Sequence, residues 1–176
     1  YRITEIDNLL EKRNLVDKNI FLQQAKNVHL LEGIPTGSLE GYLFPDTYHF
    51  GKRTTEAIII NKMIETFKER ALKQEFLKRA GDMGFSYHEI ITLASLIEKE
   101  TGKDSERKQI SSVFHNRLKK NMLLQTDPTV IYVIDIFDGN IRKRDLKIDS
   151  PYNTYLYKGL PPGPIANPGL KSIIAA

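Results

Sequence analysis

Residues 91–102 read ITLASLIEKETG, an apolar run that ends in two glutamates, Glu98 and Glu100. Just before it, residues 86–89 (SYHE) match the S-x-x-E capping box, in which a serine and a glutamate satisfy free backbone N–H groups at the start of a helix. Gly102 is a residue type that commonly ends one. The sequence therefore predicts a helix from Ser86 to about Gly102, with two ionisable groups at the end of its apolar run.

Helical geometry separates the two glutamates. At roughly 100° per residue, Glu100 extends an apolar stripe, whereas Glu98 falls at its flank. The stripe consists of Ile90, Leu93, Ala94 and Ile97. We therefore expect Glu100 to meet the interior or to line a cleft. Loss of hydration there raises the pKa of a carboxylic acid and keeps it protonated near neutral pH, which is what a general acid needs.

A plainer interpretation of Glu100 is that it ends the helix and pairs with Lys103 or Arg107 at the surface. Periodicity alone favours this alternative, because perturbed carboxylates are uncommon. Other chemistries have less support in the sequence. The four histidines show no spacing typical of a metal site, and the chain has neither a glycine-rich phosphate loop nor a G-x-S-x-G elbow.

The rest of the chain reads as a helix-rich α+β fold with a small antiparallel sheet. Asp138-Gly139-Asn140 marks a tight turn, which we expect to join two short strands. Residues 32–51 and 150–168 are rich in Gly, Pro and aromatic residues, so irregular structure is expected there. Apolar spacing and capping residues predict further helices at 4–13, 17–26 with Asp17 as N-cap, 54–80, 104–120, 128–134 with Asp127 as N-cap, and after Asn167-Pro168.

Composition sets broad limits on function. The 176 residues are 40% hydrophobic and 27% charged, an ordinary balance for one globular domain. The chain has no cysteine, which excludes disulfide and thiolate chemistry, and no apolar run long enough to span a membrane. The net charge of +4 could suit a polyanion, but the basic residues are dispersed. Both ends look cut, so we expect a fragment of a longer protein.

A second candidate site region combines polar and aromatic residues. Residues 124–129 read LQTDPT, and residues 152–155 read YNTY before a Pro- and Gly-rich stretch. Tyr, Asn, Gln and Thr can stack on sugar rings and bind their hydroxyl and acetamido groups, and a rigid backbone would hold them in place. The alternative, an ordinary structured loop with buried tyrosines, stays open on these residues alone.

Five strings, taken together, resemble the endolytic murein transglycosylase (MltG or YceG-like) family. They are EGYLFPDTY (40–48), ASLIEKETG (94–102), SSVFHNRL (111–118), LQTDPTVIY (124–132) and SPYNTYLYKGLPPGPIANPG (150–169), in that order along the chain. The resemblance implies a lytic enzyme that cuts peptidoglycan strands internally, between N-acetylmuramic acid and N-acetylglucosamine. It also places the catalytic glutamate of the E-K-E-T motif on Glu100.

The mechanism that this resemblance implies needs one carboxyl group and no metal or cofactor. The residues expected to line the glycan groove are Gln125, Thr126, Asp127, Tyr152, Asn153 and Tyr155, although Asp127 could instead be a helix cap only. If the products prove to be hydrolytic, a second carboxylate such as Asp46 or Asp127 has to be found. Two rival functions remain: a non-catalytic peptidoglycan-binding domain, and a nucleic-acid-binding module suggested only by the basic pI.

The expected domain organisation is one catalytic-domain fragment over residues 1–176. Residues 1 to about 35 form a helical N-terminal part, and residues 36–176 the transglycosylase core. The resemblance implies a single membrane anchor, a LysM-like region and a further C-terminal stretch that this fragment lacks. It also implies a catalytic domain on the extracytoplasmic side of the cell membrane, with glycan strands and wall-synthesis proteins, and no nucleic acid, as partners.

Overall fold

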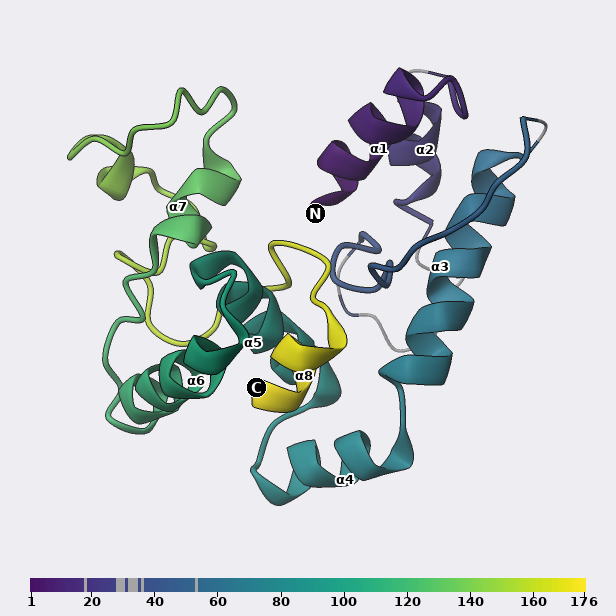
Figure 1. The fold of residues 1–176 in the computed structure, drawn as a ribbon. Helices are drawn as coiled ribbons and strands as arrows, with labels where there is room; N and C mark the ends of the chain where they lie inside the picture. The colour runs from purple at the N-terminus through teal and green to yellow at the C-terminus, as the bar shows by residue number, and fades with distance from the viewer. Residues whose placement is uncertain (18, 28–30, 32–34, 36, 53) are drawn as a thin grey trace.

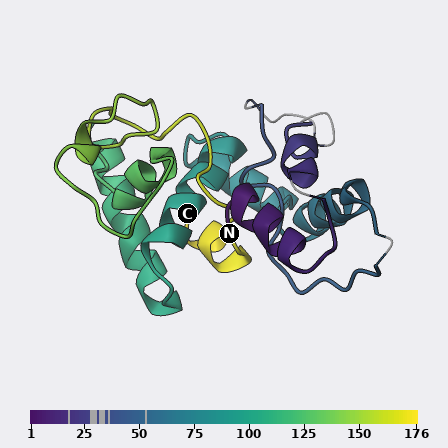
Figure 2. The ribbon, with the colours of Figure 1, turned by 90° about the horizontal axis from the view of Figure 1, so that it is seen from above.

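The computed structural model describes residues 1–17, 19–27, 31, 35, 37–52 and 54–176, which form helices joined by irregular segments (Figure 1). Figures 1 and 2 show α1, α2 and α3 gathered on one side and α5, α6 and α7 on the other, with α8 between them. The helices are α1 (Ile3–Lys12), α2 (Ile20–Gln24), α3 (Glu56–Arg70), α4 (Gln74–Asp82), α5 (Tyr87–Glu100), α6 (Asp104–Lys119), α7 (Asp127–Val133) and α8 (Leu170–Ala175).

Helix α5 is the centre of the core, and it contacts α4, α6, α7 and α8. The predicted start at Ser86 is confirmed, because its hydroxyl accepts the N–H of Glu89 while the Glu89 carboxylate accepts the N–H of Ser86. The prediction that α5 buries only one face is wrong, because every residue from 90 to 97 is buried. Thr92 and Ser95 tolerate this because their hydroxyls donate to backbone carbonyls one turn earlier, at 2.8 and 2.7 Å.

The helix predicted over residues 54–80 is two helices, α3 and α4. The chain turns at Ala71, which is fully buried. The Ala71 carbonyl accepts the hydroxyl of Tyr87 rather than a backbone N–H of a continuing helix. Helices α1 and α7 lie within one residue of their predicted bounds. Helix α2 is shorter than predicted and begins after Asn19 rather than after Asp17, and α8 begins at Leu170.

The antiparallel sheet is the main error of the sequence-based prediction, since the described residues contain no strand. Around Asp138, side chains take up the backbone groups that a strand ladder would need: Asp138 accepts the N–H of Asn140, and Asp145 accepts that of Arg142. Ile136 is 90% exposed, so the segment also has no apolar face to bury in a sheet. A short 3₁₀-helix, Asp145–Lys147, follows the turn. The fold class is therefore helical rather than α+β.

Asn167 joins three distant segments in the interior. Its side-chain carbonyl accepts the N–H groups of Gly41 and Leu43, both at 2.9 Å, and its amide donates to the Tyr1 carbonyl and to Glu40 Oε1, both at 3.0 Å. Gly41 has φ +92°, and a Cβ there would lie 2.4 Å from Cγ of Pro164. This position therefore requires glycine, because the chain segments before and after α5 touch there.

Candidate active site

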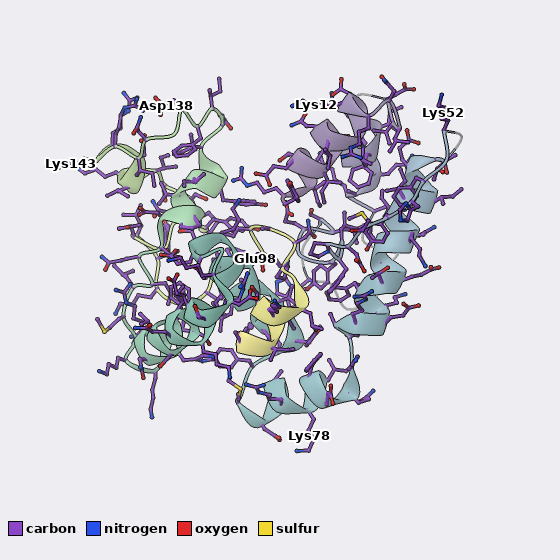
Figure 3. All side chains as sticks on the ribbon, viewed as in Figure 1. Lys12, Lys52, Lys78, Glu98, Asp138 and Lys143 are labelled. Atoms are coloured by element: carbon purple, nitrogen blue, oxygen red, sulfur yellow. The ribbon has the colours of Figure 1, made fainter. Side chains whose placement is uncertain are left out.

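The two glutamates of α5 have different surroundings. Glu98 Oε2 accepts the hydroxyl of Ser172 at 2.5 Å and the N–H of Gly169 at 3.3 Å, and it lies 3.9 Å from Nη2 of buried Arg107. Figure 3 shows Glu98 beside α8. Glu98 is thus a structural residue that fastens α8 to α5 and α6.

Glu100 is the last residue of α5, and it is exposed. Of the two expected positions, the interior is therefore wrong, because α5 emerges from the core after Ile97, and a position lining a cleft stays a prediction. The expected alternative partners, Lys103 and Arg107, instead bind Glu106 and Asp104. Among the described residues, the Glu100 carboxyl group accepts one hydrogen bond, from the hydroxyl of Thr126 to Oε2 at 2.7 Å. Glu100 is thus an accessible acid held from one side.

Thr126 belongs to a cluster of three buried threonines, Thr126, Thr129 and Thr154. The Thr126 N–H donates to Thr154 Oγ1 at 3.1 Å, and its carbonyl accepts the Thr129 hydroxyl at 2.7 Å. The hydroxyls of Thr129 and Thr154 are 2.8 Å apart. This cluster fastens the start of α7 to the segment around residue 154, and so brings both sequence-predicted site regions to Glu100.

Asp127 and Tyr155 form a second pair at this site, with the Tyr155 hydroxyl donating to Asp127 Oδ1 at 2.5 Å. Burial, the hydrogen bond to Asp127 and the negative charges of Asp127 and Glu100 raise the pKa of Tyr155 to about 12, while the positive charge of Arg117 opposes them. Asp127 is the first residue of α7, and Thr126 is the N-cap, so the expected capping role of Asp127 is wrong. The Asp127 carboxylate faces Tyr155 instead.

Gln125 is exposed and has a left-handed backbone, with φ +49°. Its N–H donates to the carbonyl of Thr154 at 3.1 Å, and Arg117 binds the carbonyl of the preceding Leu124. Such a backbone is uncommon outside glycine and persists only where the surroundings hold it. The Gln125 side chain remains available on the surface beside Thr126.

Asn153 differs from the other predicted groove residues because it is fully buried. Its amide donates to the carbonyls of Leu146 and Ile148 at 3.1 and 2.8 Å, and its side-chain oxygen accepts the N–H of Tyr155 at 3.0 Å. The expectation of a direct glycan contact is therefore not supported for Asn153. Its place in the structure is to hold the loop that carries Tyr155.

Tyr152 packs against Tyr132 of α7 with the ring centroids 4.9 Å apart, and sequence analysis missed this partner. It also missed Arg2, whose guanidinium carbon lies 4.6 Å from the centroid of the Tyr132 ring and whose Nη2 donates to the Ile131 carbonyl at 3.1 Å. These contacts bring the start of α1 to α7. Nothing in the local sequence around Arg2 indicates them, because the partners are far apart along the chain.

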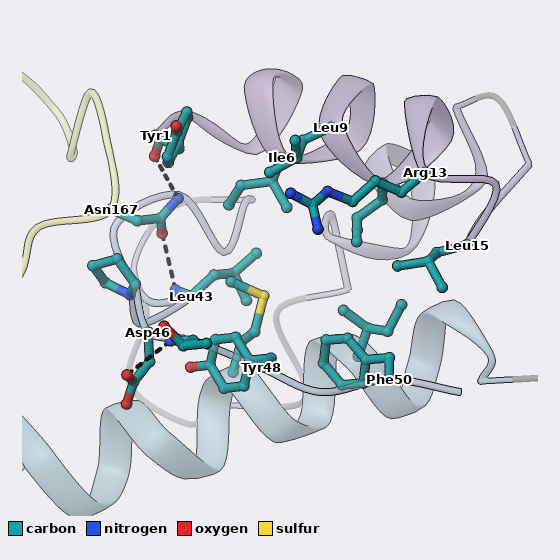
Figure 4. A pocket seen from close by; sticks show the side chains of 15 residues that line it. Tyr1, Ile6, Leu9, Arg13, Leu15, Leu43, Asp46, Tyr48, Phe50 and Asn167 are labelled. Atoms are coloured by element: carbon teal, nitrogen blue, oxygen red, sulfur yellow. Dashed lines mark hydrogen bonds between the residues drawn. The ribbon is translucent and has the colours of Figure 1, made fainter. Parts of the chain in front are cut away.

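A separate pocket of about 310 Å³ lies between α1, α3 and the segment around Tyr48 (Figure 4). Its lining is mainly apolar, with Arg13 and Asp46 among the polar members. Asp46 lines this pocket and binds Arg70 at 2.8 Å. In the described part of the chain, no three His, Asp or Glu side chains are arranged to hold a metal ion, and no helix is long and apolar enough to cross a membrane.

Known proteins share this sequence and this fold. The model of the YceG-like family matches residues 1–176. An endolytic murein transglycosylase of Bacillus subtilis (strain 168) is 47% identical over 146 residues, which cover 78% of this chain and 38% of that protein. One of Streptococcus pneumoniae (strain ATCC BAA-255 / R6) is 37% identical over 172 residues, covering 90% and 31%.

A solved structure, that of a putative YceG-like protein from Listeria monocytogenes, superposes with a TM-score of 0.86 at 34% identity, covering 100% of this chain and 62% of that one. The chain spans less than two fifths of the length of the two curated relatives above. The resemblance found in the sequence is confirmed, and the chain belongs to the YceG-like family.

Proposed function

We propose that this chain is the catalytic part of a lytic transglycosylase, which cleaves the bond between N-acetylmuramic acid and N-acetylglucosamine within peptidoglycan strands. The proposal is supported by relatives named endolytic murein transglycosylase, which align with most of the chain. The observation that carries it is the position of Glu100, an exposed carboxyl group at the end of a buried helix, beside Thr126 and the Asp127–Tyr155 pair. The relatives' names do not favour a non-catalytic binding domain.

The chemistry needs one group that first gives and then takes a proton. Glu100 donates its proton to the glycosidic oxygen, the bond from that oxygen to the muramyl C1 breaks, and the N-acetylglucosamine unit leaves as an alcohol. The ionised carboxylate then accepts the proton of the muramyl C6 hydroxyl, whose oxygen closes on C1 to form the 1,6-anhydro ring. No water is consumed. The internal hydroxyl competes with water because its effective concentration can reach on the order of 10⁵ M.

Asp127 is the carboxylate that could turn the reaction into hydrolysis, since a hydrolase needs a second carboxylate to activate water. Its Oδ1 accepts the hydroxyl of Tyr155, so Asp127 is placed beside Glu100 and the products decide between the two mechanisms. Digestion of purified wall sacculi, followed by mass analysis, tests the proposal. We expect 1,6-anhydromuramyl ends, lighter by one water than hydrolytic ends, and cuts within strands. Reducing ends that carry labelled oxygen from water would overturn the mechanism.

We further propose that the whole protein acts at the outer side of the cell membrane, held by an anchor, in contact with the wall polymer and with wall-synthesis proteins. Peptidoglycan as the substrate supports an extracytoplasmic position. Fractionation of cells producing the whole protein, with protease added from outside, tests this proposal. Protection of the catalytic domain in intact spheroplasts would contradict it.

A further inference from the structure

The hydrogen bond between Thr126 and Glu100 distinguishes the two oxygens of the carboxyl group. The Thr126 hydroxyl donates to Oε2 at 2.7 Å, whereas Oε1 has no hydrogen-bond partner in the described part of the chain. Glu100 is exposed, so the unbonded Oε1 is free to meet a substrate. A carboxyl group held in this way offers two chemically different positions for a proton.

Thr126 is held firmly enough to maintain this difference. Its side chain is 2% exposed, its N–H is taken by Thr154, and its carbonyl is taken by Thr129. A buried hydroxyl needs an acceptor, and Glu100 Oε2 is the one that the described residues provide for Thr126 Oγ1. The hydroxyl hydrogen therefore lies on the Oε2 side, which disfavours a carboxyl proton at the same oxygen.

We propose that Thr126 is a positioning residue that occupies Oε2 of Glu100 and leaves Oε1 to carry the catalytic proton. The inference rests on the proposed function and deepens it. Oε1 gives its proton to the glycosidic oxygen and takes back the proton of the C6 hydroxyl, so one oxygen serves both steps. Thr126, which the sequence analysis assigned to substrate binding, acts through Glu100 instead.

Other charged groups around the site stay the same in the test below. Lys99 precedes Glu100 on α5 and lies 3.9 Å from Glu5 of α1. Asp127 of α7 is bound to Tyr155, and Arg117 of α6 is close enough to affect the pKa of Tyr155. A change confined to Thr126 leaves all of these charges in place, so its effect on Glu100 can be assigned to the hydroxyl.

The test compares Thr126→Val, which has nearly the same shape but no donor, with Thr126→Ser, which keeps the donor. Thr92→Val is the matched control, because Thr92 is a buried threonine on α5 whose hydroxyl donates to the carbonyl of His88. The titration of Glu100 is followed by NMR with carbon-13-labelled glutamate, and its signal is assigned by its loss in Glu100→Gln. Lytic rates are measured over the same pH range.

A hydrogen bond to the ionised form favours it, so its removal lets the protonated form persist to higher pH. We expect Thr126→Val to move the alkaline limb of the rate profile upward relative to wild type. We expect kcat to fall on the order of tenfold or more. Thr126→Ser should return both toward wild type, and Thr92→Val should leave both unchanged.

An unchanged Glu100 titration in Thr126→Val overturns the inference, whether or not the chain is lytic. If Thr126→Ser moves the titration as far as Thr126→Val does, the effect is one of packing, and the inference is likewise overturned. An upward shift in Thr126→Val alone supports the positioning role. Failure of the proposed function is seen separately, as wild-type protein that digests no sacculi.

Discussion

Asn167 donates a hydrogen bond to Glu40 Oε1 at 3.0 Å, and Glu40 is a buried carboxyl group that also accepts the N–H of Ile3. Burial raises the pKa of Glu40 from 4.5 to about 7, against the opposing effects of the Ile3 hydrogen bond and the charge of Arg2. The folded protein therefore holds the Glu40 proton more tightly than the unfolded chain does.

The first prediction concerns the pH dependence of stability. The contribution of Glu40 is fully present below pH 4.5 and is lost as the pH rises through about 7, because the ionised form has to be buried. Wild type should lose about 3 kcal/mol of unfolding free energy relative to Glu40→Gln over this range. Urea unfolding of both proteins at about pH 4 and about pH 8 measures the difference. An equal pH dependence in the two proteins would show that Glu40 does not titrate in this window.

The second prediction concerns the contact between Gly41 and Pro164. Gly41→Ala adds a Cβ that lies 2.4 Å from Pro164 Cγ at a residue with φ +92°, so the free energy of unfolding should fall by about 3–5 kcal/mol. Gly84→Ala is the control, because Gly84 has φ +78° and open space around it. It should cost only about 1–2 kcal/mol. Denaturant unfolding measures both losses of free energy. Equal losses in the two variants would mean that Pro164 moves away from the added Cβ without cost.

The third prediction separates the two glutamates of α5. Glu98→Gln should lower the free energy of unfolding by about 2 kcal/mol, because it removes the negative charge beside Arg107, and it should keep lytic activity. Glu100→Gln should abolish lysis and change stability by less than about 0.5 kcal/mol, because Glu100 is exposed. Sacculus digestion and thermal melts measure both properties. If Glu98→Gln is inactive and Glu100→Gln is active, Glu98 is the catalytic acid instead.

The fourth prediction tests the structural role of Asn153. Asn153→Ala leaves the carbonyls of Leu146 and Ile148 without their donor, so the free energy of unfolding should fall by about 2 kcal/mol and activity should fall with it. Asn140→Ala, in an exposed turn of the same region, should have little effect on either. Activity that disappears while the melting temperature stays fixed would instead place Asn153 against the substrate.

The sequence predicts the parts of this fold that local interactions determine. The Ser86–Glu89 capping box involves residues three positions apart and is found as expected. Helix α7 begins within one residue of its predicted start, although its N-cap is Thr126 rather than Asp127. The burial of α5 on all sides is set by helices that lie elsewhere in the chain, so apolar periodicity could not predict that the core ends at Ile97.

The same limit applies to the candidate site. Motif resemblance brings Glu100, Thr126, Asp127 and Tyr155 together, and the structure places them side by side. The hydrogen-bond donors to Glu98 lie 71 and 74 positions away, and Arg2 and Ile131 are 129 positions apart. Such contacts leave no local pattern. The predicted strands are absent from the described residues because of local contacts. The side chains of Asp138 and Asp145 accept nearby backbone N–H groups that a strand ladder would need.

The position of Asn167 has a consequence for synthesis on the ribosome. Its side chain bonds to Tyr1 across 166 positions and to Gly41 across 126, so the segment that holds α1 in place lacks its partner until nearly all of these residues have been translated. Closing such long loops is entropically costly and slow compared with forming a helix. The capped helix α5 can form while the chain is still growing, but the interior around Gly41 cannot close before Asn167 has been added. Nascent chains that stop before Asn167 are therefore expected to expose this part of the core to chaperones and proteases.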